Sequence, residues 1–142
     1  MLDFDLSTSV RDKIWKQTTA QASLPCSEAA YFERARRGVE CHSTRRQYRR
    51  VQVSGRGAVD RDGELLGVYA IDISPASAGF YCPVQLFPKE RITLWFEEYG
   101  QLQLVICRCR RLKPACYACG GVFLDGAMSP AAYSELLRCL RD

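Results

Sequence analysis

The sequence of 142 residues has no apolar run that approaches the roughly 20 residues of a membrane-spanning helix. Its first residues, Met1 to Asp5, lack the basic start and the apolar core of a secretory signal peptide. From these two absences we expect a cytoplasmic protein without a membrane span. The eight cysteines are then expected to be reduced thiols rather than a disulfide framework.

Groups for catalysis are also scarce. The chain has one histidine, His42, and no set of nucleophile, base and orienting residue stands out. A glycine loop of the P-loop kind is missing as well. We therefore expect a binding protein without enzyme activity and without a catalytic cofactor. The net charge of +4 is too small by itself to indicate nucleic acid binding.

Helical signals come first along the chain. Ser9 can cap a helix that runs to about Ala22, and Ser27 can cap a second helix that Gly38 ends. Tyr31 is part of an apolar face on the second helix. We expect residues 1–44 to form an N-terminal helical extension and linker, with a helical hairpin over residues 9–38.

After residue 50 the apolar period changes from helical to two, which predicts strands. The expected strands are residues 51–59, 65–71, 79–82, 92–96, 102–106 and 117–124. Asp62-Gly63 predicts a hairpin turn between the first two. Ser129-Pro130 begins an amphipathic helix that includes Leu136 and Leu140. The expected fold class is mainly β, a six-stranded antiparallel barrel or sandwich closed by a C-terminal helix.

Four cysteines have spacing that is compatible with zinc, namely Cys107, Cys109, Cys116 and Cys119. In an extended strand the first two would share a face, and a turn at Pro114 would bring the other two near. Cysteine is also an ordinary small core residue, and this segment reads well as strand, turn and strand without metal. We favour the interpretation without metal and keep zinc as the alternative.

Two polar stretches remain to be explained. Arg45, Arg46, Arg49 and Arg50 stand just before the first strand. A guanidinium can hold a phosphate with two parallel hydrogen bonds and can stack on a base, although a solvated basic run is the simpler reading. Asp72 and Ser74 end the second strand, where they can contact a guanine edge or can simply form a turn.

Taken together, in this order and separation, the two stretches resemble the motifs of the PilZ domain family. Members carry Arg-x-x-x-Arg before the first barrel strand and Asp/Asn-x-Ser-x-x-Gly after the second. Residues 46–50 match the first motif, and residues 72–76 match the second through five positions. Ser77 stands where the family has glycine, and Gly79-Phe80 matches the run into the next strand. The resemblance covers residues 45–142 and implies a PilZ-like β-barrel domain there.

The resemblance implies that the ligand is cyclic di-GMP, a bacterial second messenger. Arg46 and Arg50 would hold its phosphates and guanines, and Asp72 and Ser74 would contact guanine edges. Ser77 and Gly79 belong to the same binding segment. Arg45 is compatible with an intercalated ligand dimer, which favours two ligands per site. A register shifted to Arg45 and Arg49 stays open.

Ser77 is a departure with a physical consequence. Glycine serves where φ is positive or where the backbone approaches a ligand closely. If Ser77 were left-handed, the serine would cost about 1 kcal/mol or more, a weakening of roughly tenfold in affinity.

The leading functional hypothesis is a receptor that changes conformation on binding cyclic di-GMP and signals to an unidentified partner protein in motility, biofilm or exopolysaccharide control. Ligand would tie the Arg45–Arg50 segment to the barrel and reorient the N-terminal helices or expose a surface. The alternative is a degenerate PilZ module that only contacts proteins. A third, less favoured hypothesis is nucleic acid binding by the arginine segment, with Tyr48 stacking on bases.

Overall fold

The computed structural model describes residues 15–36, 40–41, 48–96 and 99–141. The elements in these residues are β1 (Ala20–Gln21), α2 (Glu28–Arg36), β2 (Glu40–Cys41), β3 (Arg50–Gln52), β4 (Arg56–Arg61), β5 (Glu64–Ile73), β6 (Ser77–Cys82), β7 (Arg91–Phe96), β8 (Gly100–Lys113), β9 (Cys116–Phe123) and α3 (Pro130–Arg141). None of the helices in this described part is long and apolar enough to span a membrane.

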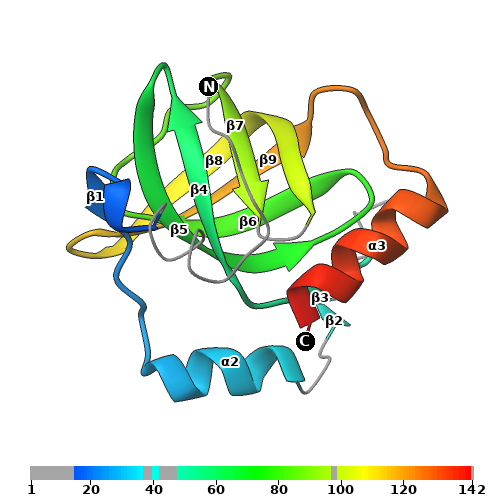
Figure 1. The fold of residues 1–142 in the computed structure, drawn as a ribbon, viewed down its shortest axis with the longest axis horizontal. Coiled ribbons are helices and arrows are strands. Elements are labelled where there is room, and N and C mark those ends of the chain that lie inside the picture. Colours follow the sequence, from blue (N-terminus) through cyan, green and yellow to red (C-terminus); the bar gives the residue numbers. More distant parts are fainter. Residues whose placement is uncertain (1–14, 37–39, 42–47, 97–98, 142) are drawn as a thin grey trace.

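Six strands form a closed antiparallel barrel (Figure 1). The order around the barrel is β4, β5, β6, β9, β8 and β7, and β7 pairs with β4 to complete the ring. The predicted fold class is thereby confirmed, and the alternative of a sandwich is excluded. Asp62-Gly63 forms the predicted turn, with both residues at positive φ as a two-residue hairpin requires.

The core lies inside the barrel and extends to α3, which packs beside it (Figure 1). Leu136 and Leu140 of α3 are fully or almost fully buried among the barrel residues. Ser129 caps the helix, since its hydroxyl accepts a hydrogen bond from Ala132 N–H at 3.2 Å. The amphipathic C-terminal helix is confirmed in both its start and its buried face.

The described pairings contain three register shifts, and two of them, on β5 and in the middle of β8, change which side chains point inward near the site. On β5, Leu66, Val68 and Ala70 point inward, and an irregularity between Ala70 and Asp72 turns Asp72 outward. On β8, the shift falls between Ile106 and Arg108. The additional residue is Ile71 in β5 and Cys107 in β8. Each of them changes which of the following side chains face the core.

The N-terminal part differs from the predicted helical hairpin. Residues 15–17 are helical, but Ala20–Gln21 is strand β1, which pairs in parallel with β5 at Leu66 and Gly67. The predicted helix to Ala22 is therefore wrong at its C-terminal end, and its predicted start at Ser9 lies outside the described residues. The cause is tertiary: β6 pairs only with Tyr69 to Ile73 of β5, so β1 covers the remaining edge.

The predicted first strand over residues 51–59 is wrong as a single element. The chain forms β3 and β4 instead, separated by residues 53–55, and only β4 belongs to the barrel. Gly55 has φ of +148°, and an added Cβ would lie 3.2 Å from Leu140 Cδ2. The break lets β3 leave the barrel and pair with the end of β5.

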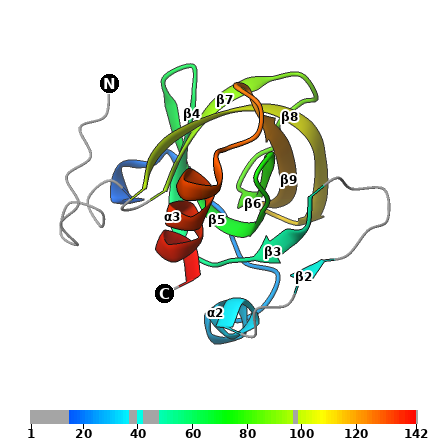
Figure 2. The same cartoon turned by 90° about the vertical axis from the view of Figure 1, so that its right-hand side faces the viewer.

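The second predicted helix is confirmed as α2, although its predicted end at Gly38 lies outside the described residues. α2 lies below the barrel in both views (Figures 1 and 2). Ser27 caps it by accepting a hydrogen bond from Ala30 N–H at 3.1 Å. The buried Tyr31 hydroxyl donates to Ala70 O at 2.5 Å and accepts from Gly55 N–H at 2.9 Å. Burial raises the pKa of Tyr31 well above its usual range.

Arg34 connects α2 to the irregular part of β5 through hydrogen bonds. Its guanidinium donates to Ile71 O at 3.0 Å and to Val53 O at 2.8 Å. It also lies 5.2 Å from the centre of the Tyr31 ring. Arg34 is thus a structural arginine, in contrast to those expected at a ligand site.

Replacing Tyr31 with Phe should destabilise the protein because Gly55 N–H and Ala70 O would lose a buried partner. We expect the free energy of unfolding to fall by about 1–3 kcal/mol, measured by urea denaturation. Tyr99→Phe is the control, since the Tyr99 hydroxyl has no hydrogen bond to the residues described here. An equal loss in both variants would contradict the assigned role of Tyr31.

Candidate functional site

Arg50, the last residue of the arginine segment, begins β3, which lies outside the barrel and pairs with the end of β5. In β3, Val51 pairs with Ile73 and Gln52 pairs with Asp72, so Arg50 stands at the level just beyond Ile73, where Ser74 begins the turn. Arg50 is half-buried. Of the predicted site residues, Arg50 is therefore brought beside Asp72 and Ser74. Arg45 and Arg46 lie outside the described residues, so their positions stay a prediction.

A straight row of residues crosses the outer wall of the barrel from Asp72. The pairs Asp72–Gly79, Gly79–Gly120 and Gly120–Arg108 follow one another across β5, β6, β9 and β8. Directly paired residues point to the same side of a sheet. Asp72 and Arg108 consequently stand on the same face, with two adjacent glycines between them.

The two glycines form the floor on which these charged side chains lie. An added Cβ on Gly79 would collide with Asp72 Oδ1, and one on Gly120 would come within 3.2 Å of Arg108 Nε. The carboxylate thus lies over one glycine and the guanidinium over the next. We call this surface, formed by Asp72, Gly79, Gly120 and Arg108, the glycine strip.

The turn after β5 is held by two serine hydroxyls. Ser74 is buried, and its Oγ lies 2.7 Å from Ser77 Oγ and accepts a hydrogen bond from Ala76 N–H at 3.2 Å. Ser77 does not have positive φ. The predicted cost of a left-handed serine at this position therefore does not arise. Serine here instead supplies a hydrogen bond that glycine could not make.

The four cysteines considered for zinc do not come together as a set. Cys109 and Cys119 are opposite each other in β8 and β9, whereas Cys107 is exposed and Cys116 pairs with Lys113 near the hairpin end. The predicted common face of Cys107 and Cys109 is wrong because the register shift on β8 separates them. The described residues contain no group of three or more possible ligands arranged to hold a metal ion.

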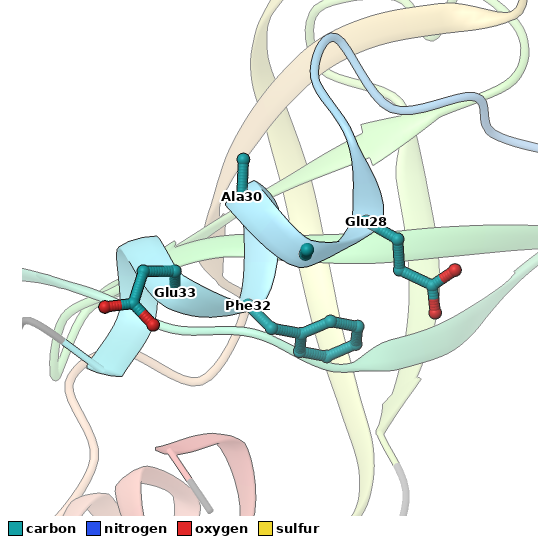
Figure 3. Close-up of a pocket in the computed structure, with 5 residues that line it drawn as sticks. Glu28, Ala30, Phe32 and Glu33 are labelled. Carbon is teal, nitrogen blue, oxygen red and sulfur yellow. The ribbon is translucent and has the colours of Figure 1, made fainter.

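A hollow on the outside of α2 is lined by Glu28, Ala29, Ala30, Phe32 and Glu33 (Figure 3). Its side chains come from a single helix, and two of them are carboxylates. An anionic ligand would be repelled there. The hollow therefore does not fit the phosphate chemistry that the arginines suggest.

The glycine strip can recognise a flat ring with both donors and acceptors on its rim. A carboxylate only accepts hydrogen bonds and a guanidinium only donates them. The Asp72 end of the strip therefore binds donors, and the Arg108 end binds acceptors. The glycines themselves carry no side chain, so a ring that displaces the ends of Asp72 and Arg108 could approach the backbone closely. Arg108 was not predicted as a site residue. The signal for it was the pair Gly120-Gly121 in a strand, which indicates a close approach of another group.

The sequence model of the PilZ domain matches residues 44–141. Among solved structures, the inhibitor of motility MotI/DgrA of Bacillus subtilis is similar, with a TM-score of 0.53 at 16% identity over 68% of this chain. This chain covers 50% of that protein's length. The PilZ domain with c-di-GMP of YcgR from Escherichia coli has a TM-score of 0.44 at 16% identity, over 68% of this chain and 89% of that one. No curated protein sequence matches significantly.

Replacing Ser77 with Gly should destabilise the turn, because the Ser74 hydroxyl loses its partner and an extended residue gains backbone freedom. We expect a loss of about 1–2 kcal/mol in the free energy of unfolding. Ser77→Ala, the control, should lose only the part that comes from the hydrogen bond. A Ser77→Gly variant as stable as the wild type would contradict the role of this hydroxyl.

Proposed function

Because its PilZ domain covers most of its length, this chain belongs to the PilZ domain family, and from that premise we propose that it is a receptor for cyclic di-GMP. The observation that carries the proposal is the glycine strip, which meets Arg50 and Ser74 at its Asp72 end. One surface thus combines groups that suit phosphates with groups that suit guanine edges.

In this binding mode a guanine lies flat over Gly79 and Gly120. Asp72 accepts hydrogen bonds from the N1–H and the exocyclic amine of guanine, which are donors. Arg108 donates to O6 and N7, the acceptor edge that arginine prefers in guanine recognition. An adenine presents an amine at the position of O6, so this pair of charges favours guanine.

The phosphates are assigned to the arginine segment. Arg50 is near the strip through the pairing of β3 with β5, and Arg46 is four residues earlier. We retain Arg45 and Arg46 as further ligands, with Ser74, Ser77 and Gly79 shaping the base end. Two ligand molecules per site remain our prediction, as does the division into residues 1–44 and 45–142.

The proposed output is conformational rather than catalytic. β3 is joined to the irregular part of β5, since Val53 N–H donates to Ile71 O at 3.0 Å. Arg34 of α2 donates to Ile71 O and Val53 O. A ligand that pulls on Arg50 would therefore act on the same backbone groups that hold α2, and through α2 on a partner protein.

Calorimetric titration with cyclic di-GMP is the first test. We expect the wild type to bind, and Arg50→Ala, Asp72→Asn and Arg108→Ala each to lose about 1–3 kcal/mol, which is roughly five- to hundredfold in affinity. Asp72→Asn keeps the shape of the side chain but replaces one acceptor oxygen with an amide NH2 group, which is itself a donor and faces the donors of guanine.

Arg110→Ala is the matched control, because Arg110 is also exposed on β8 but pairs with Ala118 outside the strip. It should bind like the wild type. No heat with the wild-type protein would reject the proposed function and favour an adaptor that only contacts proteins. If Arg110→Ala and Arg108→Ala lost equal affinity for cyclic di-GMP, Arg108 would contribute only its positive charge and no specific contact with guanine.

Gly79→Ala tests the floor of the strip without removing a charge. The new Cβ must displace the Asp72 carboxylate, a flexible side-chain end, so the barrel should still fold. We expect the affinity for cyclic di-GMP to fall at least about tenfold. Gly63→Ala is no suitable control because Gly63 has positive φ. The control is Ala118→Gly, two pairs along β9 from Gly120. Unchanged binding by Gly79→Ala would contradict the proposed geometry.

A further inference from the structure

Three thiols from three strands meet inside the barrel. They are Cys82 at the end of β6, Cys109 on β8 and Cys119 on β9. Cys119 donates a hydrogen bond to Cys109 Sγ at 3.1 Å, and its thiol also contacts Cys82. The proposed ligand contacts do not use any of these groups.

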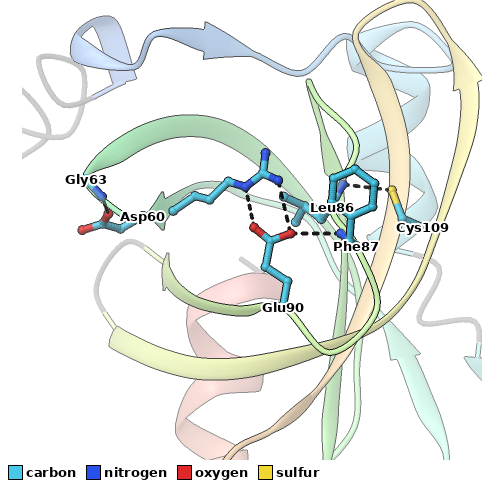
Figure 4. A network of polar contacts seen from close by, with 7 residues as sticks. Asp60, Gly63, Leu86, Phe87, Glu90 and Cys109 are labelled. Carbon is cyan, nitrogen blue, oxygen red and sulfur yellow. Dashed lines mark hydrogen bonds and ion pairs between the residues drawn. The ribbon is translucent and has the colours of Figure 1, made fainter.

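Cys109 differs from its two neighbours in its access to solvent. Cys82 and Cys119 are 0% and 3% exposed, whereas Cys109 is half-buried. Leu86 N–H donates a hydrogen bond to Cys109 Sγ at 3.5 Å (Figure 4). Cys109 therefore combines an accessible sulfur, a hydrogen-bond donor and a second thiol in contact.

The loop that supplies this donor is itself fixed. Glu90 forms an ion pair with Arg61 and accepts a hydrogen bond from Phe87 N–H at 3.0 Å (Figure 4). Since Leu86 directly precedes Phe87, these bonds hold its N–H beside Cys109.

The protons are distributed unequally among the three sulfurs. The hydrogen-bonding contact with the Cys82 thiol, together with burial, raises the pKa of Cys119, and the same contact lowers the pKa of Cys82. Cys119 therefore keeps its proton at neutral pH. Cys82 is the more acidic thiol of that pair, but it is closed off from solvent.

We propose that Cys109 and Cys119 form an oxidation site at which a hydroperoxide produces a cross-strand disulfide. Cys109 Sγ attacks the peroxide oxygen, which breaks the O–O bond, releases an alcohol or water, and leaves a sulfenic acid. Cys119 Sγ then attacks the sulfenic sulfur, and the hydroxyl leaves with the Cys119 proton as water. Overall, two thiols are oxidised and one hydroperoxide is reduced.

The backbone already has the required geometry. Cys109 and Cys119 are directly paired in antiparallel strands, where Cα atoms are about 4.5–5.5 Å apart, within the range that a disulfide spans. The sulfurs need to approach from 3.1 Å to about 2.05 Å. More exposed Cys107 has no such arrangement, because its thiol donates to Val105 O. This inference does not depend on the proposed function.

The test treats the reduced full chain with one equivalent of hydrogen peroxide, alkylates the remaining thiols and maps disulfides by peptide mass spectrometry. We expect the chain to lose two hydrogen atoms and to yield a peptide pair joined through Cys109 and Cys119, in monomeric protein. A disulfide through Cys82 and Cys119, a link between chains, or first oxidation at Cys107 or Cys26 would overturn the proposal.

Two variants separate the steps. In Cys119→Ala the sulfenic acid on Cys109 should persist and be captured by dimedone, whereas Cys109→Ser should lose the disulfide and the dimedone adduct. The control Cys107→Ser, on the same strand, should form the disulfide at the wild-type rate. The wild-type disulfide map decides the question even if Cys119→Ala fails to fold. The assigned order, with Cys109 oxidised first, would be contradicted if dimedone labelled another thiol of Cys109→Ser to the same extent as it labels the wild-type protein.

Discussion

The side chains that reach the outer wall of this barrel depend on two single-residue bulges. If Ile71 were a regular ladder residue instead of the extra residue of a bulge, the alternation that sends Val68 and Ala70 inward would also bury Asp72. If Cys107 were likewise a regular ladder residue, Arg108 would share the inner face with Ile106. A carboxylate and a guanidinium inside an apolar core would be costly, so the bulges place both charges where solvent or a ligand can meet them.

The bulge on β5 also joins the site to the N-terminal part of the chain. Its extra residue leaves backbone carbonyls that the regular ladder does not satisfy, and Tyr31 and Arg34 of α2 donate to them. Val53, just after β3, uses the same Ile71 carbonyl. A structural arginine and a tyrosine thus connect α2 to the point where β3 brings Arg50 to the glycine strip.

Much of the fold could be predicted because strong local patterns agree with it. The period of two, the Asp62-Gly63 turn and the Ser129 cap gave six barrel strands and α3 in the right order. What failed depends on distant partners: β1 is a strand because β5 has an open edge, and β3 separates from β4 at Gly55.

At the site, the resemblance to the PilZ motifs implied the proximity of Arg50, Asp72 and Ser74. The sequence analysis did not include Arg108 in the site, and it assigned Cys107 and Cys109 to one face of a strand. Both errors arise because the hydrophobic period of a sequence does not reveal where a β-bulge lies. The cost considered for a left-handed Ser77 does not arise, since Ser77 has no positive φ in the turn that it forms with Ser74.

The central claim is that a guanine lies over Gly79 and Gly120, between the ends of the Asp72 and Arg108 side chains that the bulges turn outward. Backbone amide NMR of the wild-type protein, titrated with cyclic di-GMP, tests it most directly because glycine signals are well separated. The account predicts that the signals of Gly79 and Gly120 shift strongly, while that of Gly63, in the β4–β5 hairpin turn, stays in place. Ligand binding that leaves Gly79 and Gly120 unshifted would contradict it.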